Sequence, residues 1–212
     1  MKNIGLLFGI IMLVVAAGCR ERNTVLSDPG VSLPEEPEMP VFAVEAVALN
    51  DEAVELLGRD SERAMTLLDQ AIAQQPNYHL AYANKGTLLI EKKQYHEAAR
   101  CFEKAASLRP RCAEYYVGLA FALARSGNLE GARRWSRYAI AAYNLRLQTD
   151  RKDSFTRLNR ALVVFILGYK DLALQEIEAV LHEDPDFGPA QGLRAEIEST
   201  DESDPWTILG LD

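Results

Sequence analysis

Small and apolar residues recur along the middle of the chain with a period of 34 residues. Within each period they lie three or four positions apart, the spacing of one face of an amphipathic helix. The clearest stretch predicts a helix over 81–92, a short turn and a second helix over 95–108, which Pro110 ends because proline cannot continue a helix. The recurring positions are Ala64, Ala98 and Ala132, then Ala71, Ala105 and Ala139, with Pro76 and Pro110 closing two successive units. This period predicts a stack of helical hairpins.

A fourth unit follows, but its Ala173 lies 41 residues after Ala132 instead of 34. The seven extra residues are close to two helical turns, so they can lengthen a helix without turning its buried face away. The sequence therefore predicts that the second helix of unit three runs from Leu129 to about residue 148.

The segments that follow this helix have helix-boundary signals. Residues 149–153 are predicted as a connection, with Asp153 or Ser154 as the N-cap of the next helix. Residues 189–199 combine apolar positions with alternating charge, the pattern of a helix that caps the open end of a stack.

The units follow one order of side-chain types, completely in unit two and with departures in the others: a bulky residue, a small one, a large one, alanine, a large apolar residue, alanine and proline. Unit two carries them in Tyr82, Gly86, Leu89, Ala98, Phe102, Ala105 and Pro110. In this order the chain resembles the tetratricopeptide repeat family. The resemblance implies an all-α, right-handed superhelix of about four helical hairpins plus a capping helix. The domain is expected at 41–199, with units at about 45–78, 79–112, 113–146 and 154–187.

The first nineteen residues have the order of a signal peptide: Lys2, an apolar run over 4–15, small residues over 16–18, and Cys19. The apolar run is shorter than the roughly 20 residues of a membrane-spanning helix. The segment resembles bacterial lipoprotein precursors, which implies that residues 1–18 are cleaved and that Cys19 carries the lipid. Ala16 stands where that family usually has leucine, so an ordinary secretory signal cleaved nearby is the alternative.

Two flanking segments lack apolar periodicity. Residues 19–40 are rich in proline and glutamate and are predicted to form a semi-extended tether, the alternative being a loop packed on the domain. Residues 200–212 form an acidic tail that contains Trp206, Ile208 and Leu209. We expect this tail either to fold back on the domain or to be free.

Composition and motifs narrow the function. The chain has 212 residues, 48% of them hydrophobic, a net charge of -8 and a pI near 5.0, which opposes binding to nucleic acid. It has no phosphate loop, no nucleophile elbow and no His or Cys residues at metal-ligand spacing. We therefore expect no enzyme activity, no catalytic residue, no cofactor and no metal.

Two cysteines lie within the predicted repeats. Cys101 lies about two turns before the end of its predicted helix, roughly 10 Å along the axis from Leu108. A disulfide needs Cα atoms within about 7 Å. Cys101 and Cys112 are therefore predicted to be free, largely buried thiols.

The resemblance also implies a concave groove lined by the first helix of each unit, with a groove-facing residue two positions after the bulky one. Asn50, Asn84 and Asn159 occupy that position in units one, two and four, while Gly118 breaks the series in unit three. A side-chain amide both donates and accepts, so a ladder of amides can hold a peptide backbone. The alternative is that these amides serve local packing. The other expected groove residues are Thr87, Phe121 and Leu162.

The expected function is a non-catalytic, membrane-tethered scaffold or adaptor for protein partners in the bacterial envelope, which could assist assembly of an envelope, pilus or secretion complex. A protein or peptide with an apolar face is the expected partner. The alternative is a lipoprotein that binds a small or lipidic ligand in an apolar groove. Arg20 follows Cys19, which favours the outer membrane, facing the periplasm, in a cell with two membranes. The sequence makes no prediction of the oligomeric state.

Overall fold

The computed structural model of the chain describes residues 31–38 and 40–200. These residues contain nine α-helices and no strand. The helices are α2 (Val44–Leu56), α3 (Ser61–Gln74), α4 (His79–Glu91), α5 (Tyr95–Leu108), α6 (Ala113–Arg125), α7 (Leu129–Thr149), α8 (Ser154–Ile166), α9 (Lys170–Glu183) and α10 (Gly188–Ser199). The helix predicted over 95–108 is α5, and the capping helix predicted over 189–199 is α10, which begins one residue earlier.

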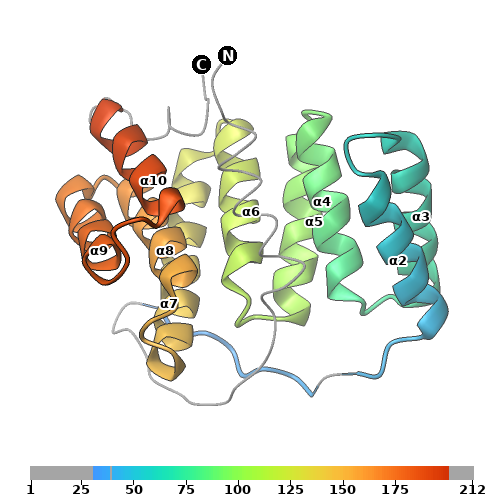
Figure 1. The fold of residues 1–212 in the computed structure, drawn as a ribbon. Helices are drawn as coiled ribbons and strands as arrows, with labels where there is room; N and C mark the ends of the chain where they lie inside the picture. Colours follow the sequence, from blue (N-terminus) through green and yellow to red (C-terminus); the bar gives the residue numbers. More distant parts are fainter. Residues whose placement is uncertain (1–30, 39, 201–212) are drawn as a thin grey trace.

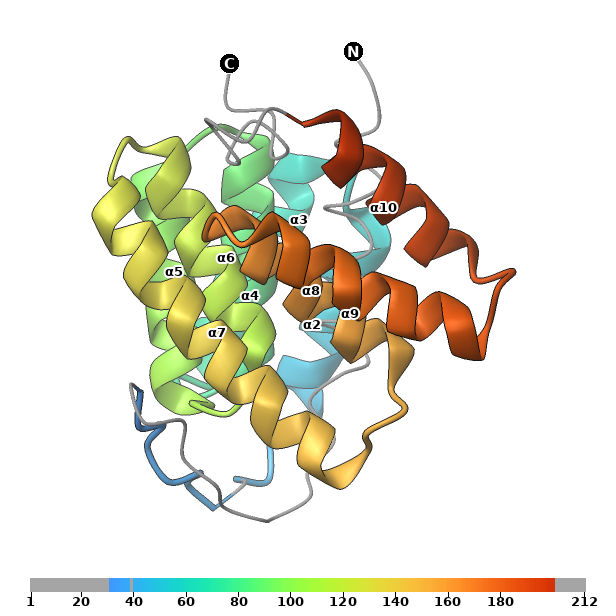
Figure 2. The same cartoon turned by 90° about the vertical axis from the view of Figure 1, so that its left-hand side faces the viewer.

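Consecutive helices pair into four hairpins, α2 with α3, α4 with α5, α6 with α7, and α8 with α9. The hairpins stand in a row, and α10 packs on α9 and α8 at the far end from α2 and α3 (Figure 1). The first helices also touch one another, because α2 contacts α4 and α4 contacts α6. Figure 2 views the row from the end at which α9 and α10 lie. The predicted all-α superhelix with a capping helix is confirmed.

The turns between the two helices of units two to four share one backbone conformation. Gly127 and Gly168 have φ angles of 87° and 95°, a region that glycine enters without steric penalty. Lys93 takes the corresponding place in unit two with φ 59°, which costs a residue with a Cβ more. A tight left-handed turn thus reverses the chain at the same point of each of these units.

The helix α7 is the long helix that the seven extra residues predict, and it ends at Thr149, one residue beyond the expected end. The side chain of Asp153 accepts a hydrogen bond from the Thr156 N–H at 3.0 Å, so Asp153 is the N-cap of α8. In the last turns of α7, Arg146 donates to both carboxylate oxygens of Glu114 on α6, at 2.7 and 2.9 Å. Glu114 is fully buried, so this bidentate pair fixes the extension against α6.

The core contains one close packing contact that explains two glycines. Phe102 is fully buried between α4 and α6. A Cβ on Gly86 would lie 2.8 Å from its ring atom Cε2, and a Cβ on Gly118 would lie 2.5 Å from Cε1. Because real Cβ atoms do not approach so closely, only glycine fits at both positions in this arrangement.

The segment before α2 differs from the predicted tether. Glu36 forms an ion pair with Arg109 at 2.5 Å, with side chains only 12% and 5% exposed, and it accepts a hydrogen bond from the Arg111 N–H at 3.1 Å. Leu33 packs against the main core. At Leu33 and Glu36 the prediction of a semi-extended tether was therefore wrong, and the alternative of a loop packed on the domain holds.

The remaining predictions about the flanks concern other residues. Cys19, the signal segment 1–18, residues 19–30 and the tail beyond Thr200 lie outside the described residues. Among the helices of residues 40–200, none is long and apolar enough to cross a membrane. Cys101 and Cys112 form no disulfide with each other, as predicted; Cys112 is buried and Cys101 is partly buried.

Candidate functional site

The six residues expected to face a partner lie on the four first helices, α2, α4, α6 and α8. Five of them are buried in the chain as a whole, and Asn84 is partly buried. They are Asn50 on α2, Asn84 and Thr87 on α4, Phe121 on α6, and Asn159 and Leu162 on α8. We call these four helices the inner row.

The structure joins the first two members of the asparagine series. Nδ2 of Asn84 donates to Oδ1 of Asn50 at 2.8 Å, which links units one and two. Asn50 in turn donates to the carboxylate of Asp51 at 3.3 Å. These two amides therefore have a structural role in the junction between the units.

The third asparagine is separated from this pair. Asn159 is 4% exposed, and its Nδ2 has no hydrogen-bond partner within the described part of the chain. Unit three cannot extend the ladder toward it, because the Phe102 ring occupies the space in which a side chain at position 118 would lie. A buried amide donor without an acceptor costs about 1–3 kcal/mol, so an acceptor that reached Asn159 would be stabilising.

The inner row is least tightly joined at the helix that carries Asn159. In the described residues, α8 packs mainly on α7, α9 and α10, and it makes little direct contact with α6. By contrast, α4 contacts both α2 and α6. Units three and four are joined mainly through α7 and α8 instead.

A buried aromatic cluster that sequence reasoning missed joins units one to three. Nδ1 of His79 lies 2.6 Å from the Tyr115 hydroxyl. The ring of Phe42 lies 4.6 Å from that of Tyr78 and 5.7 Å from that of His79. Burial, with a smaller contribution from the positive charge of Arg109, lowers the pKa of His79 to about 4. His79 is therefore neutral at physiological pH and has a packing role.

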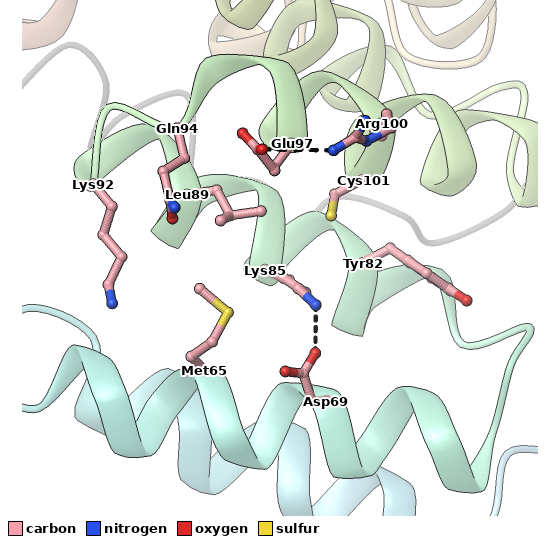
Figure 3. A pocket seen from close by; sticks show the side chains of 10 residues that line it. All are labelled: Met65, Asp69, Tyr82, Lys85, Leu89, Lys92, Gln94, Glu97, Arg100 and Cys101. Atoms are coloured by element: carbon pink, nitrogen blue, oxygen red, sulfur yellow. Dashed lines mark hydrogen bonds and ion pairs between the residues drawn. The ribbon is translucent and has the colours of Figure 1, made fainter.

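A hollow of about 480 Å³ lies between α3, α4 and α5. Met65 of α3, Leu89 of α4 and Cys101 of α5 surround the same space from three sides, and Tyr82 flanks it (Figure 3). The volume of the hollow is within the range of protein pockets, roughly 300–1,000 Å³.

Positive side chains surround the floor of the hollow. Lys85 forms an ion pair with Asp69, and Lys92 forms one with Glu62. Arg100 lies 3.6 Å from Glu97 (Figure 3). The hollow therefore offers apolar contact in its centre, and at its edge three cations together with the carboxylates of Asp69 and Glu97.

Sequence reasoning missed the hollow, although the sequence contains a signal for it. Tyr82, Lys85, Leu89 and Lys92 are spaced by three, four and three residues, which places them on one face of α4. Apolar and cationic side chains thus alternate along this face of α4. Among residues 31–38 and 40–200, no three His, Cys, Asp or Glu side chains are placed to hold a metal ion.

Comparisons with known proteins agree with this architecture. The sequence model of the tetratricopeptide repeat matches residues 79–112, which are α4, α5 and the loop to α6. No curated protein sequence matches the chain significantly.

Solved structures share the arrangement of helices. PilW, a widely conserved type IV pilus biogenesis factor, is similar with a TM-score of 0.56 and 18% identity, over 80% of this chain and 86% of PilW. A thermophilic TPR protein of Thermus thermophilus is similar with a TM-score of 0.55 and 20% identity, over 72% of this chain and 80% of that protein. These likenesses concern the fold.

Proposed function

We propose that this tetratricopeptide repeat protein is a non-catalytic scaffold that binds a protein or peptide partner along its inner row. The observation that carries the proposal is the Nδ2 group of Asn159, a buried donor without an acceptor on the helix that is least tightly joined to the row. Partner binding would supply the missing acceptor from a backbone carbonyl, while Phe155, one turn before Asn159 on α8 and 46% exposed, would supply apolar contact.

We further propose that the scaffold is tethered to a membrane of the bacterial envelope by lipid on Cys19. The order of positive, apolar and small residues before Cys19 supports this. Several acyl chains anchor a protein more firmly than one does. Lipidation that adds several acyl chains at Cys19 would therefore suffice to hold the protein at a bilayer. Arg20 supports an outer-membrane location that faces the periplasm.

We also propose that the scaffold assists the assembly of an envelope complex. PilW is described as a type IV pilus biogenesis factor, and its fold matches most of both chains. Fold similarity alone does not transfer function, so the partner must be identified directly.

Crosslinking in cells tests the binding surface. A photoreactive amino acid would replace Phe155, which is exposed on α8, and a matched control would replace Lys104, which is exposed on α5. We expect a discrete adduct with a partner protein from position 155 only. Identical adducts from both positions, or none from position 155, would contradict the proposal, and a small ligand found instead by native mass spectrometry would favour the lipid-binding or small-molecule alternative.

A substitution at Asn159 separates binding from folding. Asn159→Leu removes the unsatisfied donor, so we expect unchanged or higher thermal stability, because an apolar group of similar size replaces a buried polar one. We expect partner binding to weaken about tenfold or more, since the partner's acceptor would lose its donor. If Asn159→Leu binds the partner as well as the unaltered chain, Asn159 has no part in recognition.

The anchor needs a separate test. Palmitate labelling in cells should mark the unaltered chain and Cys101→Ala, but not Cys19→Ala. The Cys19→Ala chain should also leave the membrane fraction. Labelling that persists in Cys19→Ala would show that the lipidation assignment is wrong.

A further inference from the structure

We propose that the hollow between α3, α4 and α5 binds the acidic tail, residues 201–212, of a second copy of this chain. This surface includes another face of α4 than the one that carries Asn84 and Thr87, and the proposal does not depend on the function proposed above. It would make the protein a self-associating scaffold whose copies join head to tail.

The floor of the hollow can receive an apolar side chain. Met65, Leu89 and Cys101 present carbon and sulfur atoms toward one space (Figure 3). A thioether and a thiol are polarizable, and sulfur makes favourable contacts with aromatic rings. A large aromatic or aliphatic side chain would remove this apolar surface from water, at roughly 25 cal/mol per Å².

The cations at the edge are held in place while their present partners are easily replaced. The side chains of Lys85 and Lys92 are each only 26% exposed, whereas that of Glu62 is 86% exposed. Ion pairs with such exposed carboxylates contribute about 0–1 kcal/mol at most. A carboxylate from a bound segment can therefore take the place of Glu62 or Asp69 at little cost.

The acidic tail has the complementary chemistry in one short stretch. Three carboxylates, at Asp201, Glu202 and Asp204, precede the apolar residues Trp206, Ile208 and Leu209. An aromatic side chain such as that of Trp206 suits the floor, and the carboxylates before it suit the lysines at the edge. This charge complementarity is local, since the chain as a whole has a net charge of -8.

The position of α10 favours the tail of another copy over that of the same copy. The helix α10, which precedes the tail, lies at one end of the row of helices, and α3, α4 and α5 lie toward the other end (Figure 1). A contact between two different surfaces of identical chains is heterologous, and it extends into chains or rings of copies instead of closing as a symmetric dimer.

A thiol-protection experiment reads the hollow directly, because Cys101 lies on its floor. The full chain with Cys19→Ala, purified in mild detergent, would be treated with a thiol reagent, and modification of Cys101 would be followed by mass spectrometry. Burial raises the pKa of the Cys101 thiol, an effect that Lys85 partly offsets, so its modification is slow enough to follow. The probe is a synthetic peptide of residues 201–212. We expect saturating peptide to slow modification of Cys101 about tenfold or more.

Matched variants test the chemistry. Lys85→Glu combined with Lys92→Glu should abolish the protection of Cys101 by the peptide. Lys104→Glu, which alters an exposed lysine on α5, should leave this protection unchanged. The peptide with Trp206→Ala should protect at least tenfold less, and this arm leaves the protein unaltered if the charge reversals impair folding. Equal protection by the Trp206→Ala peptide, or no protection by the natural one, would overturn the proposal.

Sedimentation of the same chain decides whether the occupant is a second copy. We expect the mass to rise with protein concentration and to stay at that of the monomer in the Trp206→Ala chain. If the peptide protects Cys101 but the unaltered chain is monomeric at all concentrations, the assignment to a second copy is wrong. Because neither readout involves Asn159 or the lipid on Cys19, failure of this proposal is distinct from failure of the scaffold proposal.

Discussion

At the scale of single residues, Phe102 determines the chemistry of the inner row. Its ring fills the space beside Gly86 and Gly118, so the asparagine series is interrupted at position 118 for a steric reason. Asn50 and Asn84 can bond to each other, and Asn159 is left without a neighbour of its kind. The side chain that completes the core of units two and three thus also excludes an amide from position 118.

This packing predicts opposite effects for two glycine substitutions. Gly118→Ala places a Cβ against the Phe102 ring, and overpacking of this kind lowers the free energy of unfolding by typically about 1–3 kcal/mol. Gly192→Ala in α10 has open space around the new Cβ, so it should raise the free energy of unfolding by roughly 0.5–1 kcal/mol. Urea unfolding measures both, and a Gly118→Ala chain as stable as the parent would contradict the close packing.

The pair of Glu36 and Arg109 predicts a second contrast between neighbouring residues. Glu36→Gln removes the carboxylate charge from the buried ion pair with Arg109, and breaking a buried pair costs about 3–5 kcal/mol. Glu35→Gln alters an exposed carboxylate and should change the stability by less than about 0.5 kcal/mol. Hydrogen exchange should show faster exchange at Arg111 in Glu36→Gln only, because its N–H loses a charged acceptor.

At the scale of helices, the long α7 depends on one buried ion pair. Burial alone would lower the pKa of Arg146, but its hydrogen bonds to Glu114 and the charge of that carboxylate raise it, so the guanidinium stays charged. The Arg146 guanidinium also lies 5.6 Å from the centre of the Tyr143 ring. The last two turns of α7 are thus held by polar contacts as well as by apolar packing.

Replacing only one residue of the Glu114–Arg146 ion pair should therefore lower the free energy of unfolding more than replacing both. Arg146→Met leaves the carboxylate of Glu114 buried without its cation, with an expected loss of about 3–5 kcal/mol in the free energy of unfolding. Glu114→Met combined with Arg146→Met should recover most of this loss, because neither charge is then buried. A double variant that is less stable than Arg146→Met would show that the pair itself is the main stabilising element.

The sequence predicts most helices but little of the contacts between distant segments. The periodic alanines and Pro110 determine α4 and α5, and the seven extra residues determine the length of α7. These signals are local, since they depend on residues within one or two helices. Glu36 and Arg109 are 73 residues apart in the sequence, and nothing in the periodicity links them. The hollow likewise depends on how two hairpins pack, and its one signal in the sequence is the spacing of Tyr82, Lys85, Leu89 and Lys92.

At the scale of the whole molecule, the buried cluster of His79 and Tyr115 couples the stability of the stack to pH. The pKa of His79 falls from the ordinary 6.5 to about 4 on folding. Between pH 4 and pH 6.5 the unfolded chain binds more protons than the folded chain. The contribution of neutral His79 to the free energy of unfolding is therefore fully present above pH 6.5 and is lost as the pH falls toward 4. This difference in the pKa of His79 between the unfolded and the folded chain corresponds to roughly 3 kcal/mol in the free energy of unfolding.

Acid unfolding measures this coupling. We expect the melting temperature of the parent chain to fall more steeply between pH 6.5 and 4 than that of His79→Gln, which cannot take up the proton. His96→Gln, at an exposed position on α5, should behave like the parent. Parallel curves for the parent and His79→Gln would show that His79 does not titrate in this range.

The contact at Glu36 also determines how the molecule would bear a mechanical load. If the chain is held by Cys19, a pull on residues 19–30 reaches the folded domain first at Leu33 and Glu36, and so loads the loop between units two and three before α2. Tension would then be carried by the middle of the stack. Unit one, which contributes Asn50 to the inner row, would be shielded from being peeled off the end, and the ion pair with Arg109 would have to yield before the hairpins begin to separate.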